Sequence, residues 1–257
     1  MVDISPEDRR AGHDFQEVIF EKPAKKTNST SLNMAKVYGY MFMLLAITAV
    51  VSIGLGIIFT SIINNDPVIA TTVLFYLVIG SCCSLFILNI IMSFCLNKSK
   101  GSTLALSIIY SIVMGVTLSS FTTFLPWEVL GVTFLITSVI FGLLALIGTL
   151  SKGNMHPVGL AALGLLFGSV LVLGFNFIFA FLLPELWNAL CWIVSFAVFA
   201  AIMLSTIYDV WSIRKMIDQV DIKGSIAVWC AFRLYVDFIN IFIRVLYYVV
   251  IIFAKKK

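Results

Sequence analysis

Four polar residues interrupt the last apolar stretch of this 257-residue chain and have types that could do chemistry in an apolar setting. They are Arg233, Asp237, Asn240 and Arg244, separated by steps of four, three and four. This spacing places all four on one stripe of an α-helix. At membrane depth such a stripe must face the protein interior or water, and alternating charges are typical of an ion or proton path. A structural salt bridge between Arg233 and Asp237, one turn apart, is the alternative.

A second acid, Asp209, ends the preceding apolar stretch, where residues 205–209 read Ser-Thr-Ile-Tyr-Asp. Asp237 lies about 12 residues, or ~18 Å of helix, into the next stretch, which starts from the same side. If the earlier helix continues past Asp209, the two carboxyl groups can approach each other. Two carboxylates that share a site cannot both ionise cheaply, so we predict a pair that responds to protons near neutral pH. Taken alone, Asp209 would equally suit an interfacial residue at a helix end.

The composition places these residues in a membrane protein. Hydrophobic residues make up 61% of the chain and charged residues 12%, and the mean hydropathy is +1.06. This leaves too little polar surface for a soluble enzyme or a protein that binds nucleic acid through a broad basic face. Six acids and six bases lie in the first 36 residues. We therefore predict a disordered cytoplasmic tail over residues 1–36 and a transmembrane domain over residues 37–257.

Seven apolar stretches approach or exceed the ~20 residues that a helix needs to cross a bilayer. They cover about 37–63, 68–96, 103–125, 129–150, 157–183, 186–208 and 225–253. The short connections between them contain Pro, Gly, Asn and Ser, which favour turns. Short connections imply antiparallel neighbours. The fold class we predict is an all-α membrane protein built as a seven-helix bundle.

The basic residues of the connections predict the orientation. Lys98 and Lys100 follow the second stretch, Lys152 the fourth, and Arg214, Lys215 and Lys223 the sixth, whereas the other three connections carry only acids. Because cytoplasmic loops are enriched in Lys and Arg, we expect a cytoplasmic N-terminus. Seven crossings would place the three C-terminal lysines outside, against this rule.

The last stretch is marginal as a membrane span by itself. Each charge near the bilayer centre costs ~2.5–3.5 kcal/mol, and each Leu, Ile, Phe or Val returns only ~0.3–0.6 kcal/mol. With 17 such apolar residues between Ile226 and Phe253, the two sums nearly cancel. The stretch should insert by packing its charges against the other helices. We favour a full crossing, and the alternative is a segment that dips in and returns to the cytoplasm.

Two motifs resemble the paired signature of the Bax inhibitor-1 (transmembrane Bax inhibitor motif) family. Residues 203–209 read Met-Leu-Ser-Thr-Ile-Tyr-Asp, and residues 234–240 read Leu-Tyr-Val-Asp-Phe-Ile-Asn. Residues 115–119, Gly-Val-Thr-Leu-Ser, and the pair Phe175-Asn176 are weaker matches. The resemblance extends over nearly the whole membrane domain, from about residue 37 to residue 253.

The resemblance implies a bundle around a central, charge-bearing last helix that acts as a pH-sensitive calcium leak. It places the proton sensor and a weak calcium site on Asp209 and Asp237. In a bacterial relative a basic residue after the second span latches onto this pair, and this chain has Asn97 and Lys98 there instead of an arginine. Two carboxylates would bind calcium only weakly, which suits a permeant ion better than a bound cofactor.

Other classes of function fit the sequence less well than a leak channel. An intramembrane aspartyl protease also pairs two aspartates, but Asp237 lacks the Gly-x-Gly-Asp context of that class. We therefore expect no enzymatic activity, no cofactor and no nucleic-acid partner. The alternative function is a non-conducting membrane protein that modulates cell-death or protease machinery through unidentified partners. We expect a monomer in a bacterial cytoplasmic membrane, with endoplasmic reticulum or Golgi as the alternative location.

Small residues recur at helical spacing in two of the predicted spans. Gly164 and Gly168 form a Gly-x-x-x-Gly motif, and Gly115 lies one turn before Ser119. Such residues allow helix backbones to approach closely, so we predict helix contacts at both places. The five cysteines lie within apolar runs and predict buried thiols.

Overall fold

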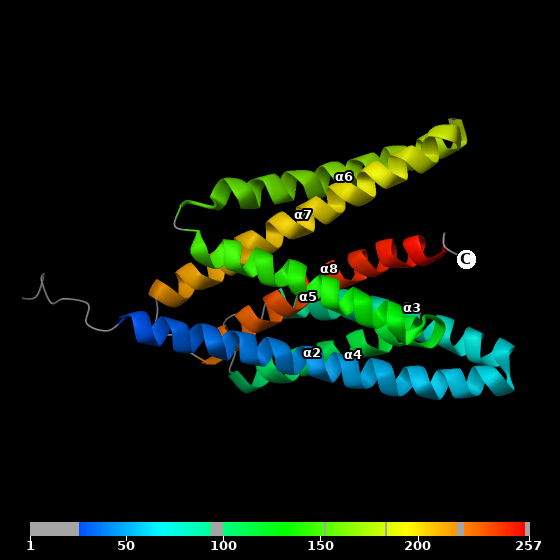
Figure 1. Cartoon of the computed structure of the whole chain (residues 1–257), viewed down its shortest axis with the longest axis horizontal. Helices are drawn as coiled ribbons and strands as arrows, with labels where there is room; N and C mark the ends of the chain where they lie inside the picture. The colour runs from blue at the N-terminus through cyan, green and yellow to red at the C-terminus, as the bar shows by residue number, and fades with distance from the viewer. Residues whose placement is uncertain (1–25, 94–99, 152, 183, 220–223, 255–257) are drawn as a thin grey trace, which may run out of the picture.

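The computed structural model describes residues 26–93, 100–151, 153–182, 184–219 and 224–254, with side chains from 33–69, 71–92, 100–151, 153–172, 191–217 and 225–254. Over these residues the fold consists of helices joined by short connections (Figure 1). The helices are α2 (Lys26–Asn65), α3 (Pro67–Ser93), α4 (Lys100–Phe124), α5 (Trp127–Leu150), α6 (His156–Leu182), α7 (Pro184–Gln219) and α8 (Gly224–Ala254). The prediction of an all-α chain with seven helices is confirmed.

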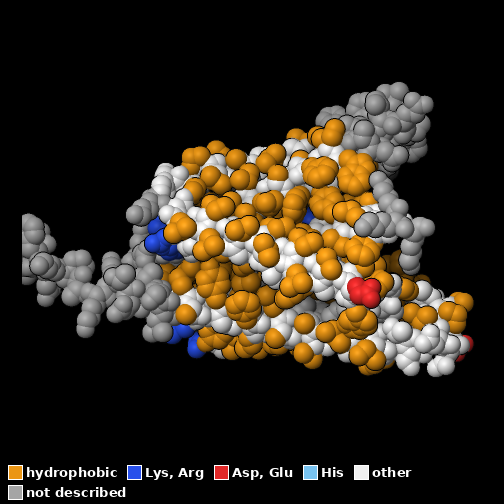
Figure 2. Space-filling view, viewed as in Figure 1, with side chains coloured by type: hydrophobic (Ala, Val, Ile, Leu, Met, Phe, Trp, Pro, Cys, Tyr) orange, Lys and Arg blue, Asp and Glu red, His pale blue; other side chains and the backbone are white. Residues whose placement is uncertain are grey.

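Six of the helices are long and apolar enough to cross a membrane over their described residues. A shorter apolar stretch, His156–Val172, lies in α6. Many large hydrophobic side chains are exposed, and they cover most of the face seen in Figure 2. Such a surface is stable in lipid and not in water, so the chain is an integral multi-pass membrane protein. The cysteine prediction is wrong for Cys82 and Cys83, which are exposed on α3.

Two helices extend beyond the spans predicted from the sequence. α2 begins at Lys26, before the expected start at residue 37, while residues 1–25 lie outside the described residues, so the disordered tail stays a prediction. α7 continues past Asp209 to Gln219. Its last turns keep Val210, Ile213 and Ile217 buried at helical spacing, which stabilises the helix beyond the apolar run.

The last helix packs against four others. α8 contacts α2, α4, α5 and α7, whereas α6 packs along α7, and α3 packs against α4 and α2 (Figure 1). Its 31 residues form one continuous helix without a break. A continuous helix of this length reaches across a bilayer, which favours a full crossing over a segment that dips in and returns.

Glycine positions determine how closely some helices approach. A Cβ on Gly115 would lie 2.7 Å from the Val51 Cβ and 2.9 Å from the Thr48 carbonyl oxygen, so α4 and α2 meet there backbone to backbone. A Cβ on Gly164 or Gly168 would meet no described atom within 4 Å. The predicted close packing therefore occurs at Gly115, and the described part of the chain does not use the motif in α6 in this way.

Hydroxyl groups join α8 to its neighbours inside the bundle. The Tyr235 hydroxyl lies 2.7 Å from Oγ1 of Thr48 on α2, and both residues are buried. Its ring packs edge-on against the ring of Tyr110 on α4, whose hydroxyl accepts a hydrogen bond from Asn89 on α3. Buried hydroxyls need such partners, because the apolar interior offers no water. The network fixes the rotation of α8 that positions Asp237.

Candidate functional site

The two acids of the sequence motifs lie close together where α7 and α8 pack. Asp209 on α7 and Asp237 on α8 are 5% and 8% exposed, and their carboxyl groups are near enough to interact electrostatically. This is the approach expected if the sixth span continues as a helix past Asp209, which it does. Two buried carboxyl groups this close together cannot both ionise cheaply, so such a pair can change its charge by gaining or losing a proton.

Among the described residues, the cation that pairs with this site is Arg233 of α8. Nη2 of Arg233 donates a hydrogen bond to Oδ1 of Asp209 over 2.5 Å, and the Arg233 side chain is 36% exposed. The predicted alternative, a salt bridge between Arg233 and Asp237 within α8, is wrong in this respect, because the guanidinium turns to the neighbouring helix. Its Cζ also lies 5.2 Å from the Trp229 ring centroid. The pair thus has two acids and one close guanidinium.

Asp237 keeps one carboxyl oxygen without a partner. Its Oδ2 is buried and has no hydrogen bond within the described parts of the chain. A buried polar atom without a partner costs roughly 1–3 kcal/mol. The lone pairs of Oδ2 are therefore free, within the described structure, to accept a proton or a cation.

The rest of the polar stripe continues along α8 away from the pair. Asn240 is exposed and Arg244 is half-buried. Only part of the predicted stripe therefore faces the protein interior in the described structure. The expected latch residues, Asn97 and Lys98, lie outside the described residues, so the latch stays a prediction.

A cavity of about 640 Å³ leads to the salt bridge from the end at which α6 begins. Its polar lining consists of Asn154, His156, Ser205, Tyr208, Asp209 and Arg233, and leucines of α6 supply much of the rest. The cavity gives polar access to Asp209 and Arg233, whereas Asp237 lies behind them. An ion or proton entering here meets the salt bridge first.

An aromatic cluster shapes the mouth of this cavity. The His156 ring lies 5.4 Å from Trp211 and 6.1 Å from Tyr208, and Nζ of Lys215 lies 4.9 Å above the Trp211 ring. Oδ1 of Asn154 accepts a hydrogen bond from the His156 backbone N–H, which holds the start of α6. The sequence did not single out these residues, because aromatic residues near helix ends are common in membrane proteins.

Two glycines let neighbouring helices approach α7 around Asp209. A Cβ on Gly148 of α5 would lie 2.8 Å from the Val210 Cβ, and one on Gly159 of α6 would lie 2.9 Å from the Tyr208 ring. Both side chains neighbour Asp209 in the sequence. Close packing on both sides therefore fixes the turn of α7 that carries the acid. No motif in the sequence predicted the contacts at Gly148 and Gly159.

The described residues around the pair supply few oxygen ligands for a cation. The described residues contain no group of three or more His, Cys, Asp and Glu side chains that could hold a metal ion. Calcium prefers six to eight oxygen ligands, and here Arg233 already occupies one Asp209 oxygen. A calcium ion at Asp209 and Asp237 would need water and carbonyl oxygens to complete its shell.

Comparisons with known proteins identify relatives across the membrane domain. Residues 30–255 match the family model described as inhibitor of apoptosis-promoting Bax1. The inner membrane protein YbhL of Escherichia coli strain K12 is 29% identical over 222 residues, covering 83% of this chain and 88% of the relative. An uncharacterized protein of Borreliella burgdorferi is 31% identical over 156 residues, covering 59% of this chain and 65% of the relative. No solved structure gives a significant match. Because the family match covers almost the whole membrane domain, the chain belongs to the Bax inhibitor-1 family.

Proposed function

We propose that this protein is a pH-sensitive calcium leak in which the Asp209–Asp237 pair is both proton sensor and cation site. The observation that carries the proposal is the proximity of two buried carboxyl groups, of which only that of Asp209 pairs with a guanidinium among the described residues. Such a pair changes its charge when it gains or loses a proton. Because it lies inside a membrane protein, that change alters both the affinity for cations and the packing of α7 on α8.

Arg233 determines the resting state in this proposal. Its guanidinium occupies Oδ1 of Asp209, so a cation that enters the cavity beside α6 must compete with a bound positive charge. Parting of the salt bridge frees Asp209 and exposes Oδ2 of Asp237 to the cavity. Weak binding by two carboxylates then suits conduction, because an ion must also leave. Asn240 and Arg244 lie further along α8, beyond the pair, and have no part in holding this resting state.

The arrangement of α8 supports its role as the central helix of the leak. It carries Arg233 and Asp237 and packs against four helices, so a shift of α7 relative to α8 changes the surroundings of both charges. We propose that the N-terminus is cytoplasmic and that the protein resides in a bacterial inner membrane. The second point is supported by the name of the Escherichia coli relative. In this view the protein is a monomer that needs lipid, protons and calcium, and it has neither enzymatic activity nor a cofactor.

Calcium flux from vesicles tests the proposal. The purified full-length protein is placed in liposomes, and calcium entry is followed with a dye trapped inside. We expect a leak that empty liposomes do not show and that Asp237→Asn reduces. Liposomes that contain the folded protein and stay as tight as empty ones would overturn the leak. That outcome would favour the non-conducting interaction protein.

A further inference from the structure

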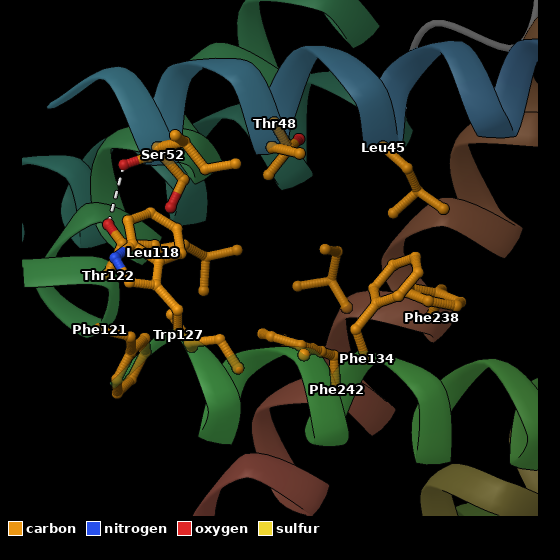
Figure 3. A pocket seen from close by; sticks show the side chains of 15 residues that line it. Leu45, Thr48, Ser52, Leu118, Phe121, Thr122, Trp127, Phe134, Phe238 and Phe242 are labelled. Atoms are coloured by element: carbon orange, nitrogen blue, oxygen red, sulfur yellow. Dashed lines mark hydrogen bonds between the residues drawn. The ribbon is translucent and has the colours of Figure 1, made fainter. Parts of the chain in front are cut away.

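We propose that the protein binds one acyl chain of a bilayer phospholipid in a pocket that opens between α2 and α5 on the membrane-facing surface. This α2–α5 pocket has a volume of about 390 Å³. Its lining includes Leu45, Ala49 and Ile53 of α2 and Trp127, Gly131 and Phe134 of α5. Leu45, Trp127 and Phe134 are labelled in Figure 3. The pocket lies apart from the cavity at Asp209 and shares no lining residue with it.

The pocket exists because its two edges are held apart by the helices behind them. α2 packs against α4 and α8, and α5 packs against α7 and α8. Leu118 of α4 and Phe238 and Ile239 of α8 form the back wall, and all three are buried. At the mouth, by contrast, Ile53, Trp127 and Phe134 are exposed. The pocket is therefore a lateral opening that leads from the surface to the side of α8.

The chemistry of the wall selects an apolar chain. Thr48, Ser52 and Thr122 bring three hydroxyl groups to the wall. Those of Thr48 and Thr122 are bonded within the protein. Oγ1 of Thr48 lies 2.7 Å from the Tyr235 hydroxyl, and Oγ1 of Thr122 donates to the Ser52 carbonyl oxygen over 2.8 Å (Figure 3). The remaining lining is almost wholly apolar, so the pocket gives a polar or charged ligand little to bind. An unbranched hydrocarbon chain fits this surface.

The position of the mouth identifies the bilayer as the source of that chain. α2 and α5 are both long and apolar enough to cross the membrane, so the space in front of the mouth is filled with lipid. Trp127 lies in the first turn of α5, at the level where tryptophan meets the headgroups. From Trp127 to Phe134 the helix rises ~10 Å toward the bilayer centre, the direction in which an acyl chain runs from its headgroup.

Van der Waals contact supplies the driving force. Lipid tails are as apolar as the pocket wall, so moving a chain inside gains nothing from the hydrophobic effect. An empty pocket, however, leaves its lining without partner atoms on one side. A chain that fills it restores those contacts and packs against Phe238, the residue that follows Asp237 on α8. This inference holds whether or not the protein conducts ions.

Photocrosslinking from inside the pocket tests the inference. The full-length protein is placed in phosphatidylethanolamine vesicles that contain phosphatidylglycerol with a diazirine near the end of one acyl chain. After illumination, labelled residues are mapped by mass spectrometry. We expect labels on the buried back wall, at Leu118, Phe238 and Ile239, as well as on the exposed lipid-facing residues. Labels confined to exposed residues would show surrounding lipid only and would overturn the inference.

Two filling variants and one matched control complete the experiment. A Cβ on Gly131 meets no described atom within 4 Å, so Gly131→Leu fills the mouth from α5, and Ala49→Leu fills it from α2. Gly142→Leu is the control, because Gly142 lies on the same helix in equally open space outside the pocket. We expect loss of back-wall labelling in both filling variants and wild-type labelling in the control. Back-wall labels that persist in a folded filling variant would contradict the pocket as their route.

Discussion

At the scale of single residues, the site depends on which acid Arg233 contacts. Within α8 the spacing of four residues permits a pair with Asp237, and the sequence provided no reason to prefer a partner on another helix. The structure pairs Arg233 with Asp209 and leaves Oδ2 of Asp237 without a partner among the described residues. The sequence motifs could therefore identify the two acids, whereas their charge balance depends on the packing of α7 against α8.

Removal of the guanidinium should open the leak. A hydrogen bond to a charged group contributes roughly 1.5–3 kcal/mol. Its loss in Arg233→Gln should therefore shift the equilibrium between the closed and open states of the leak toward the open state by about tenfold or more. The measurement is calcium flux into liposomes at fixed pH. Arg244→Gln is the control, because Arg244 lies on the same stripe of α8 beyond the pair. Equal flux in both variants and the wild type would contradict the role of Arg233.

The Tyr235 hydroxyl should stabilise the bundle rather than carry ions. Tyr235→Phe removes the contact with Thr48 at 2.7 Å, while Oγ1 of Thr48 keeps the Leu44 carbonyl oxygen at 3.0 Å. We expect a loss of about 1 kcal/mol in the free energy of unfolding, measured by titration with denaturing detergent. Tyr247→Phe, at an exposed position on the same helix, should change it little. A larger loss in the exposed variant would contradict this assignment.

At the scale of elements, hydropathy was sufficient to predict the helices but not all of their ends. Seven apolar runs correspond to the seven helices, because a membrane span must be apolar over most of its length. The extension of α7 to Gln219 was not predicted, since polar and basic residues interrupt the apolar run there. The buried face of this extension consists of Val210, Ile213 and Ile217. In the sequence, only the helical spacing of these three residues indicates it, because the rest of the segment has the composition of a loop.

The crossing of α2 and α4 should depend on the absence of a side chain at Gly115. Gly115→Ala places a Cβ within 2.9 Å of the Thr48 carbonyl oxygen, a backbone atom that cannot move aside cheaply. We expect a loss of about 1–3 kcal/mol in stability. Gly54→Ala on α2 meets no described atom within 4 Å and should be neutral or slightly stabilising. Thermal unfolding followed by size-exclusion chromatography distinguishes the two, and equal midpoints would argue against the close crossing.

At the scale of the whole molecule, the prediction of a membrane protein with antiparallel helices followed from composition and short connections. The orientation of the bundle rests on the Lys and Arg residues of alternate connections. How the helices pack was not predictable in this way. Small residues such as Gly148 and Gly159 decide which helices approach α7, and glycine is too frequent in membrane helices for its position to identify a contact.

Labelling at the two ends of α5 tests the orientation. Glu128 lies in the first turn of α5, and Asn154 lies shortly after its last residue, so the two must be on opposite sides of the membrane. A membrane-impermeant maleimide should label Glu128→Cys in intact cells and label Asn154→Cys only after the membrane is opened. The reverse pattern would place the N-terminus outside and would overturn the orientation.

The measurement that most directly tests the two-aspartate sensor is calcium flux between pH 6 and pH 8 for the wild type, Asp209→Asn and Asp237→Asn. An amide can hydrogen-bond in place of a carboxyl group but cannot titrate. We predict that Asp237→Asn removes most of the pH dependence, because Asp237 is the member of the pair with a carboxyl oxygen that has no partner among the described residues. Asp209→Asn should shift the pH profile, because it releases Arg233 and leaves Asp237 to titrate alone. Wild-type pH profiles in both variants would contradict the sensor and would leave the pair with a structural role.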